Sequence, residues 1–213
     1  MSEIFREIEE ELRRDNLLKL WSRYGRYIIA GVVLLLLIGG GIVAWREHQA
    51  SDRRAQSARY STALSLAREG KDEDAARAFG GLSREGGGYA GLAAFEEAQL
   101  QAKAGDAKAA IATYDRIAAS DGFDKELRDL AVLLSVMHSL KDGDPKALIQ
   151  RLEPLTVTGS PWRSTALELT AAARLKSGDK SGALELYQKL ADDLAAPQGL
   201  RARAAEMAAA LAP

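Results

Sequence analysis

Two histidines, His48 and His138, are the side chains in this sequence best suited to proton transfer near neutral pH. His48 follows a long apolar run, and His138 lies inside the apolar stretch 130–140. We therefore interpret both as interfacial or packing residues rather than as an acid and base pair. Carboxylates are plentiful, but neighbours such as Glu96 and Glu97 point in different directions on a helix and are interpreted as solvated.

Other motifs that carry chemistry are missing from the sequence. It has no cysteine, which excludes thiolate nucleophiles, disulfides and zinc–thiolate sites. It also lacks a Gly-x-x-x-x-Gly-Lys phosphate loop, a His-Glu-x-x-His zinc motif and a serine elbow. The formal net charge is −1, and no cluster of Lys or Arg lies outside the flanks of the apolar run. We expect no enzymatic activity, cofactor, metal, small-molecule substrate or nucleic-acid partner.

The apolar run Tyr27 to Trp45 holds nineteen residues without a charged or amide side chain. As a helix it would be about 28 Å long, close to the roughly 30 Å of a bilayer's hydrocarbon core. Trp21 and Tyr24 precede it, and aromatic residues at both ends are typical of interfacial belts. A core helix would show a polar stripe, and a secretory signal would have a shorter apolar stretch and a small-residue cleavage site. The run is therefore predicted to be an uncleaved transmembrane helix.

This predicted anchor, residues 27–45, separates a stub, residues 1–26, from a domain, residues 46–213. Five Lys or Arg residues lie in 12–26, against four in 46–60. A short N-terminal stub ahead of a single anchor usually stays in the cytoplasm. We therefore predict a cytoplasmic stub and a domain on the other side of the membrane.

The stub and the anchor each contain a surface that could dock a partner. In the stub, apolar residues at helical spacing among glutamates predict an amphipathic helix, with a break and a new N-cap at Asp15 and Asn16. In the anchor, Gly40 and Ala44 form a small-xxx-small face. Plainer interpretations are equally open: a solvated leader for the stub, and the ordinary tolerance of membrane helices for glycine.

Beyond the anchor the chain repeats itself around four glycines. Gly70, Gly105, Gly143 and Gly178 are separated by 35, 38 and 35 residues. An aspartate follows each glycine within two positions, and a cation stands two positions before it. Apolar residues match at seven positions before, nine after and twelve after each glycine. They are Ala63, Ala98, Val136 and Ala171, then Phe79, Tyr114, Leu152 and Tyr187, then Leu82, Ile117, Leu155 and Leu190.

Each repeat unit has a simple physical logic. The cation suits the last turn of a helix, the glycine takes the left-handed position after it, and the aspartate caps the next helix. A period near 35 residues is typical of a solenoid of helix pairs. The predicted fold is therefore all-α, with one N-terminal transmembrane helix, about four stacked helix pairs and a terminal helix over 198–212.

Three units carry Ala-x-x-x-aromatic after the turn glycine, and so resemble tetratricopeptide repeats. They begin at Ala75, Ala110 and Ala183, whereas the third unit departs with Leu148 and Leu152. The front end, LLKLWSRYGRYIIAGVVLLLLIGGGIVAWREHQ, leads directly into the first repeat and is similar to the bacterial family of ancillary Sec translocon subunits. This resemblance implies a single-pass inner-membrane protein with a periplasmic repeat domain.

The resemblance also implies what the protein does. The leading hypothesis is a membrane-tethered protein–protein interaction scaffold at the Sec translocon, whose partners are translocon subunits, periplasmic chaperones or unfolded polypeptide. The same domain family includes cell-division coordinators. The alternative is therefore an envelope or division component that recruits a cell-wall enzyme or regulator.

In tetratricopeptide arrays the first helix of each pair lines the concave face. Counting back from the turn glycines predicts the groove residues, which are Tyr60 and Leu64, Phe95 and Gln99, Leu133 and Met137, and Glu168 and Ala172. Asn16 is the only asparagine in the sequence, so the groove lacks the asparagines that clamp a C-terminal carboxylate. Two alternatives are open: an apolar groove that receives a partner helix or unfolded segment, or a groove filled by its own repeat or by the terminal helix.

Overall fold

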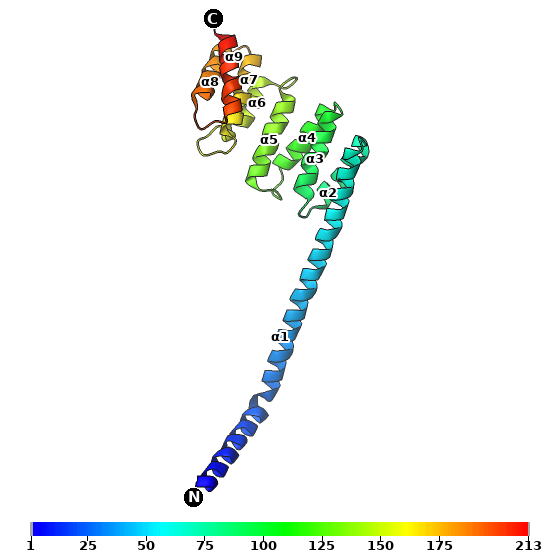
Figure 1. Cartoon of the computed structure of the whole chain (residues 1–213), viewed down its shortest axis with the longest axis vertical. Coiled ribbons are helices and arrows are strands. Elements are labelled where there is room, and N and C mark those ends of the chain that lie inside the picture. Colours follow the sequence, from blue (N-terminus) through cyan, green and yellow to red (C-terminus); the bar gives the residue numbers. More distant parts are fainter. Residues whose placement is uncertain (1, 213) are drawn as a thin grey trace. The chain divides into compact units, whose positions relative to one another are not determined.

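The computed structural model describes the backbone of residues 2–212 and the side chains of residues 23, 25–27, 29, 31 and 34–212 (Figure 1). Residues 2–212 are mainly helical and contain no β-strand, which confirms the predicted all-α class. The chain divides into two compact units, Met1–Arg54 and Ala55–Pro213.

Helix α1 runs from Ser2 to Arg68 without interruption. The break predicted at Asp15 and Asn16 is therefore wrong. Neither residue is Pro or Gly, and Asp or Asn inside a helix costs only about 0.7 kcal/mol relative to Ala, which good helix formers on both sides offset. The side chains of the predicted amphipathic stub lie outside those that the structure describes.

The first unit contains the predicted span, residues 27–45. In the part of the chain that the structure describes, none of the helices has an apolar stretch that would cross a membrane. The side chains at positions 28, 30, 32 and 33 lie outside the described set. Large apolar side chains that are described between Tyr27 and Trp45 are 48–70% exposed.

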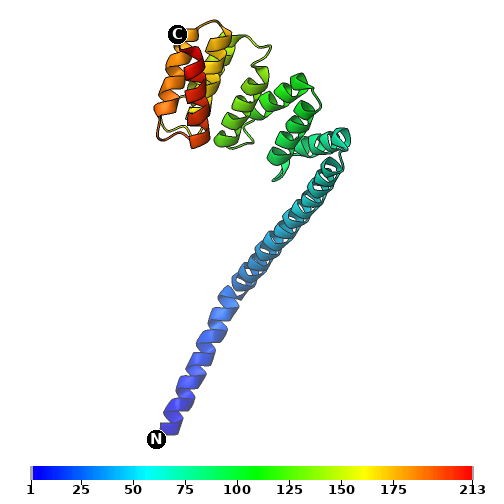
Figure 2. The same ribbon diagram turned by 45° about the horizontal axis from the view of Figure 1, so that its top comes forward.

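The second unit is a succession of helix pairs (Figures 1 and 2). Residues 55–68 of α1 pack on α2, and α3 with α4, α5 with α6 and α7 with α8 form the later pairs. The terminal helix, α9, packs on α8. The bounds are α2 Asp72–Glu85, α3 Ala90–Lys103, α4 Ala107–Ala118, α5 Lys125–Ser139, α6 Pro145–Leu152, the short 3-10 helix η1 Glu153–Leu155, α7 Arg163–Lys176, α8 Lys180–Asp192 and α9 Gln198–Leu211.

Three of the four turn glycines end their helices as predicted. Gly70, Gly105 and Gly178 have φ angles of 75°, 83° and 89°, which glycine adopts without steric cost. At each turn, the glycine amide and the amide that follows it donate to carbonyls in the last helical turn, which forms a Schellman motif. The pairs α1–α2, α3–α4 and α7–α8 are therefore joined by the same type of tight turn.

The connection between α5 and α6 is built differently. Gly143 is not left-handed, which corrects the prediction for this turn. The connection is longer, spanning residues 140–144, so one left-handed residue is not needed to reverse the chain. Glycine is required here for close approach instead, because a Cβ at Gly143 would lie 2.8 Å from the carbonyl oxygen of Ser139.

Aspartates cap three of the four second helices. Asp106, Asp144 and Asp179 accept hydrogen bonds from amides of the helix that follows, at 3.0, 3.1 and 2.9 Å. Asp72 was predicted to do the same, but it is the first residue of α2 and makes no cap bond. Its carboxylate instead lies 2.8 Å from Lys103 Nζ, which ties α2 to the end of α3.

All twelve apolar positions that the repeat predicts are buried, with at most 4% of any of them exposed. In residues 55–212 the core consists of four clusters, one for each pair, and each is completed by the first helix of the next pair. Leu100 of α3 completes the first cluster, Ala131 of α5 the second and Ala173 of α7 the third. Leu200 of α9 completes the last, so α9 takes the place of the first helix of a fifth pair.

Candidate partner-binding face

The two histidines occupy different surroundings. The ring of His138 stacks on Tyr114, with centroids 5.8 Å apart and planes at 11°, which is the packing role expected of it. His48 is exposed on α1, with Nε2 3.7 Å from Asp52 Oδ2. Among the described residues, no group of three or more His, Cys, Asp or Glu side chains is arranged to hold a metal ion.

Tyr60 and Leu64, the groove residues predicted from α1, are both half-buried against the first core cluster. The ring of Tyr60 lies 5.3 Å from the rings of Phe79 and Tyr89. Its pKa is raised by burial and by the charge and a hydrogen bond of Glu96. The Tyr60 hydroxyl therefore faces α3.

Phe95 and Gln99, the groove residues predicted from α3, share an accessible face of that helix. Gln99 is exposed and Phe95 is half-buried, with its ring 6.0 Å from that of Tyr114. Leu92 is 55% exposed on the same face. Positions 92, 95, 96 and 99 are spaced as one helical stripe. The stripe on α3 therefore presents two apolar side chains, a carboxylate and an amide.

Leu133 and Met137, the groove residues predicted from α5, differ from one another. Met137 is 46% exposed, whereas Leu133 is only 3% exposed and packs in the third core cluster with Leu148 and Leu152. The assignment of Leu133 to an open groove is therefore corrected. Leu152, which stands where the other pairs have an aromatic ring, is buried in the same cluster.

The fourth pair meets the terminal helix at its predicted groove position. Glu168 of α7 is half-buried and accepts two hydrogen bonds from Arg203 of α9, at 2.9 and 3.0 Å. The charge of Glu168 also helps burial to raise the pKa of Tyr187. Ala172 is half-buried. At this end of the array, the chain's own α9 supplies a cation to the first-helix face.

A small apolar pocket opens beside the stripe on α3. Its volume is about 270 Å³, and it is lined from α3 by Leu92 and Phe95 and from the α5 side by Phe123 and Leu127. Glycines form much of its rim, from the connections before α3 and before α5. A Cβ at Gly91 would lie 3.2 Å from the ring of Phe123, so glycine allows these two segments to pack closely.

Glu97, interpreted from the sequence as solvated, is only 7% exposed. Its carboxylate lies 2.8 Å from Arg116 Nη2 and accepts a 3.3 Å hydrogen bond from Ser83. A Cβ at Gly80 would come within 2.6 Å of Glu97 Oε1, so this glycine makes room for the carboxylate. Glu97 is therefore a structural link between α2, α3 and α4, which corrects the prediction.

A second polar network joins the next helices. Ser135, fully buried in α5, donates to Asp115 at 2.6 Å, and Arg151 of α6 pairs with the same carboxylate oxygen at 2.5 Å. Like the network around Glu97, it connects one pair to the next with satisfied hydrogen bonds. We assign both networks to the scaffold rather than to a site.

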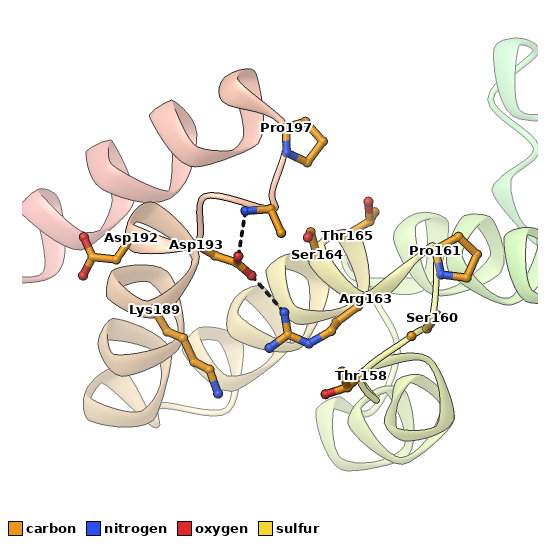
Figure 3. Close-up of a pocket in the computed structure, with 12 residues that line it drawn as sticks. Thr158, Ser160, Pro161, Arg163, Ser164, Thr165, Lys189, Asp192, Asp193 and Pro197 are labelled. Carbon is orange, nitrogen blue, oxygen red and sulfur yellow. Dashed lines mark hydrogen bonds and ion pairs between the residues drawn. The ribbon is translucent and has the colours of Figure 1, made fainter.

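A depression of about 920 Å³ lies between the α7 N-terminus and the α8–α9 connection (Figure 3). Arg163 donates to Asp193 at 2.9 Å, and the amide of Ala195 donates to the same side chain at 3.0 Å. These bonds, the backbone one foremost, hold the pKa of Asp193 below its usual range. Arg163 and Asp193 neutralise each other, and their contacts hold the connection that leads into α9.

Gly40 and Ala44, the predicted packing face of the anchor, are exposed on α1. A Cβ built at Gly40 would meet no atom of the described chain within 4 Å. The face is thus open in the first unit, and its role in packing stays a prediction.

Comparison with known proteins identifies the fold family. A family model described as a tetratricopeptide repeat-like domain matches residues 19–209. The chain belongs to this family. The departing third pair is thus a variant of the repeat: it keeps the buried positions, with Leu148 and Leu152 in place of alanine and an aromatic residue.

Among curated proteins, this tetratricopeptide repeat-like chain is similar to the ancillary SecYEG translocon subunit of Escherichia coli strain K12. The two are 26% identical over 175 residues, which cover 80% of this chain and 81% of that protein. No solved structure matches the chain.

Sequence reasoning placed the face on the first helices but missed two of its features on α3. Glu96 was interpreted as solvated, and the glycines at 86–88 were not connected with a pocket. The spacing of Leu92, Phe95 and Glu96 on one helical stripe was the available signal for both.

Proposed function

We propose that this protein is a membrane-anchored interaction scaffold and an ancillary subunit of the Sec translocon. The carrying observation is the accessible first-helix stripe of α3 in a tetratricopeptide repeat-like array. Stacked repeats present extended surfaces to other polypeptides. Similarity to the ancillary SecYEG translocon subunit over four fifths of the chain supports the choice of complex.

Residues 27–45 serve as the membrane anchor in this proposal. The large apolar side chains that the structure describes there are 48–70% exposed along α1. Exposing apolar area to water costs about 25 cal/mol per Å², and a bilayer removes that cost. Gly40 and Ala44 then offer a small-residue face on which a translocon helix can pack closely.

The proposed topology puts residues 1–26 in the cytoplasm and the repeat domain in the periplasm of a bacterial cell. There the domain would hold periplasmic chaperones or emerging polypeptides close to the channel. Reporter fusions test the placement: a periplasm-specific reporter should be active at the C-terminus and inactive at the N-terminus. Activity of a cytoplasmic reporter at the C-terminus would reject it.

Site-specific photocrosslinking in living cells tests the choice of complex. A photoreactive amino acid at Gly40 should yield adducts with channel subunits, and one at Gln99 should yield adducts with a chaperone or a translocating chain. Gln188 and Glu185, exposed on α8, are matched control positions away from the first-helix face. Adducts with septal proteins instead would favour the division role, and an absence of specific adducts from both test positions would reject the scaffold proposal.

A further inference from the structure

The stripe on α3 has an acidic flank that no Lys or Arg side chain described in the structure neutralises. Glu96 is half-buried beside Phe95. Its charge raises the pKa of Tyr60, where burial acts first, and also contributes to the raised pKa of Tyr114, again after burial. The carboxylate therefore lies close to the phenols of two helices. Within the described residues it forms no ion pair with Lys or Arg, whereas the adjacent Glu97 pairs with Arg116.

The other flank of the stripe is mainly apolar, with Asp124 among the residues that line it. Phe95 and Leu92 line the pocket of about 270 Å³, together with Phe123 and Leu127. This volume is below the roughly 300–1,000 Å³ of sites that enclose small molecules, and suits the insertion of a side chain. Phe95 and Glu96 are successive residues, so a segment crossing α3 would meet an apolar recess and a carboxylate within one helical turn.

The fourth pair provides an internal precedent for what neutralises such a carboxylate. Glu168 stands one position off Glu96 in the repeat register, and its charge raises the pKa of Tyr187, after burial, as that of Glu96 does for Tyr114. Glu168 is bound through two hydrogen bonds by Arg203, which is carried on a helix, α9, packed on this pair. Two parallel bonds between guanidinium and carboxylate are among the strongest polar contacts in proteins.

We propose that Glu96 is the acceptor for an arginine or lysine on a helical segment of a partner protein, and that an apolar residue one turn away on that segment enters the pocket lined by Leu92, Phe95, Phe123 and Leu127. The inference rests on the proposed scaffold function and specifies the chemistry of its partner: an amphipathic, basic helix.

Peptide binding to the full-length protein in non-ionic detergent micelles tests this proposal. The first probe is a labelled helical peptide of about four turns with leucines and arginines one turn apart. A second peptide replaces the arginines with glutamine, and a third replaces the leucines with alanine. The wild-type protein should bind the first peptide about tenfold more tightly than the second, the effect of one charge-assisted hydrogen bond.

Substitutions in the protein then test whether the Glu96 carboxylate causes the preference for arginine. Glu96→Gln should remove the preference for arginine over glutamine while leaving the melting temperature unchanged. Glu185→Gln makes the same charge change on the exposed face of α8 and should keep the preference. Leu92→Ala should weaken binding of both leucine peptides to a similar extent. Identical micelles in every measurement cancel any affinity of the peptides for detergent.

Three outcomes would overturn the inference: an arginine preference that survives Glu96→Gln, an equal loss in Glu185→Gln, or no binding of any peptide by the wild-type protein. The crosslinking experiment separates this failure from failure of the scaffold function. Adducts with translocon components from Gln99 without an arginine preference would leave the scaffold and remove only the basic partner.

Discussion

The second and fourth helix pairs each carry a half-buried glutamate on their first helix, but among the described residues only Glu168 is paired with a cation. In the fourth pair Glu168 is held by Arg203 from α9, and Leu200 of α9 closes the core. In the second pair the core is closed equally well by α5, yet Glu96 has no cation from the described chain. The next helix can therefore complete the core of a pair without supplying a cation to the glutamate on its first helix.

The largest expected difference is between a buried and an exposed position on α5 when each is changed to glutamate. Leu133→Glu should lower the free energy of unfolding by more than about 4 kcal/mol, because it buries an unpaired carboxylate. Met137→Glu, one turn away and exposed, should change it by less than about 0.5 kcal/mol. Urea denaturation followed by circular dichroism measures both. Equal losses would show that Leu133 belongs to the face after all.

The two tyrosines at equivalent core positions provide the next test. Tyr114→Ala and Tyr187→Ala should each cost about 3–5 kcal/mol, the usual effect of emptying a large aromatic site. The losses should be similar, because α9 covers Tyr187 as α5 covers Tyr114. If Tyr187→Ala were much milder, α9 would be a loosely attached helix rather than a substitute for a fifth pair.

The two adjacent glutamates of α3 are expected to differ in their effect on stability, by a smaller amount. Glu97→Gln should lower the free energy of unfolding by about 1–2 kcal/mol, because it removes a charge-assisted bond to Arg116. Glu96→Gln should change it by less than about 0.5 kcal/mol. Thermal melts of both variants under one buffer condition provide the measurement. A larger effect from Glu96 would mean that its contacts with tyrosine stabilise the fold.

The smallest expected effect concerns pH and the connection into α9. The pKa of Asp193 is lower in the folded protein than its unfolded value near 3.9, so its contribution is present above about pH 5 and is lost as pH falls through the folded pKa. Asp193→Asn should therefore be less stable than wild type at pH 7, and the two should converge in acid. Asp192→Asn, at an exposed neighbour, is the control. A difference that persisted at low pH would assign the effect to shape rather than charge.

The repeat register was predictable because local chemistry specifies it. Gly70, Gly105 and Gly178 adopt the left-handed conformation that these turns require. The buried positions follow at fixed spacing from each glycine. The conformation of Gly143 was predicted wrongly, because glycine is used both where φ is left-handed and where two segments approach closely. Only the longer interval around it indicates the difference.

Burial on the first helices was harder to predict, since it depends on the partner helix. Glu96 and Glu97 are neighbours of one residue type, and what separates them is the space that Gly80 leaves on α2. Leu133 is buried in one cluster with Leu152 of α6, which stands where the other pairs have an aromatic ring. A single helical wheel contains neither fact. The pocket beside Phe95 likewise depends on two connections being brought together.

The place of α9 at the position of a first helix has a consequence for how arrays of this kind change length. A pair inserted between α8 and α9 would separate Arg203 from Glu168, whereas a helix packed on the other face of α9 would leave that contact in place. In a quasi-one-dimensional array, each such insertion adds its own stability and one more interface. The contacts of α9 with the fourth pair therefore favour lengthening of the array beyond α9 over insertion before it.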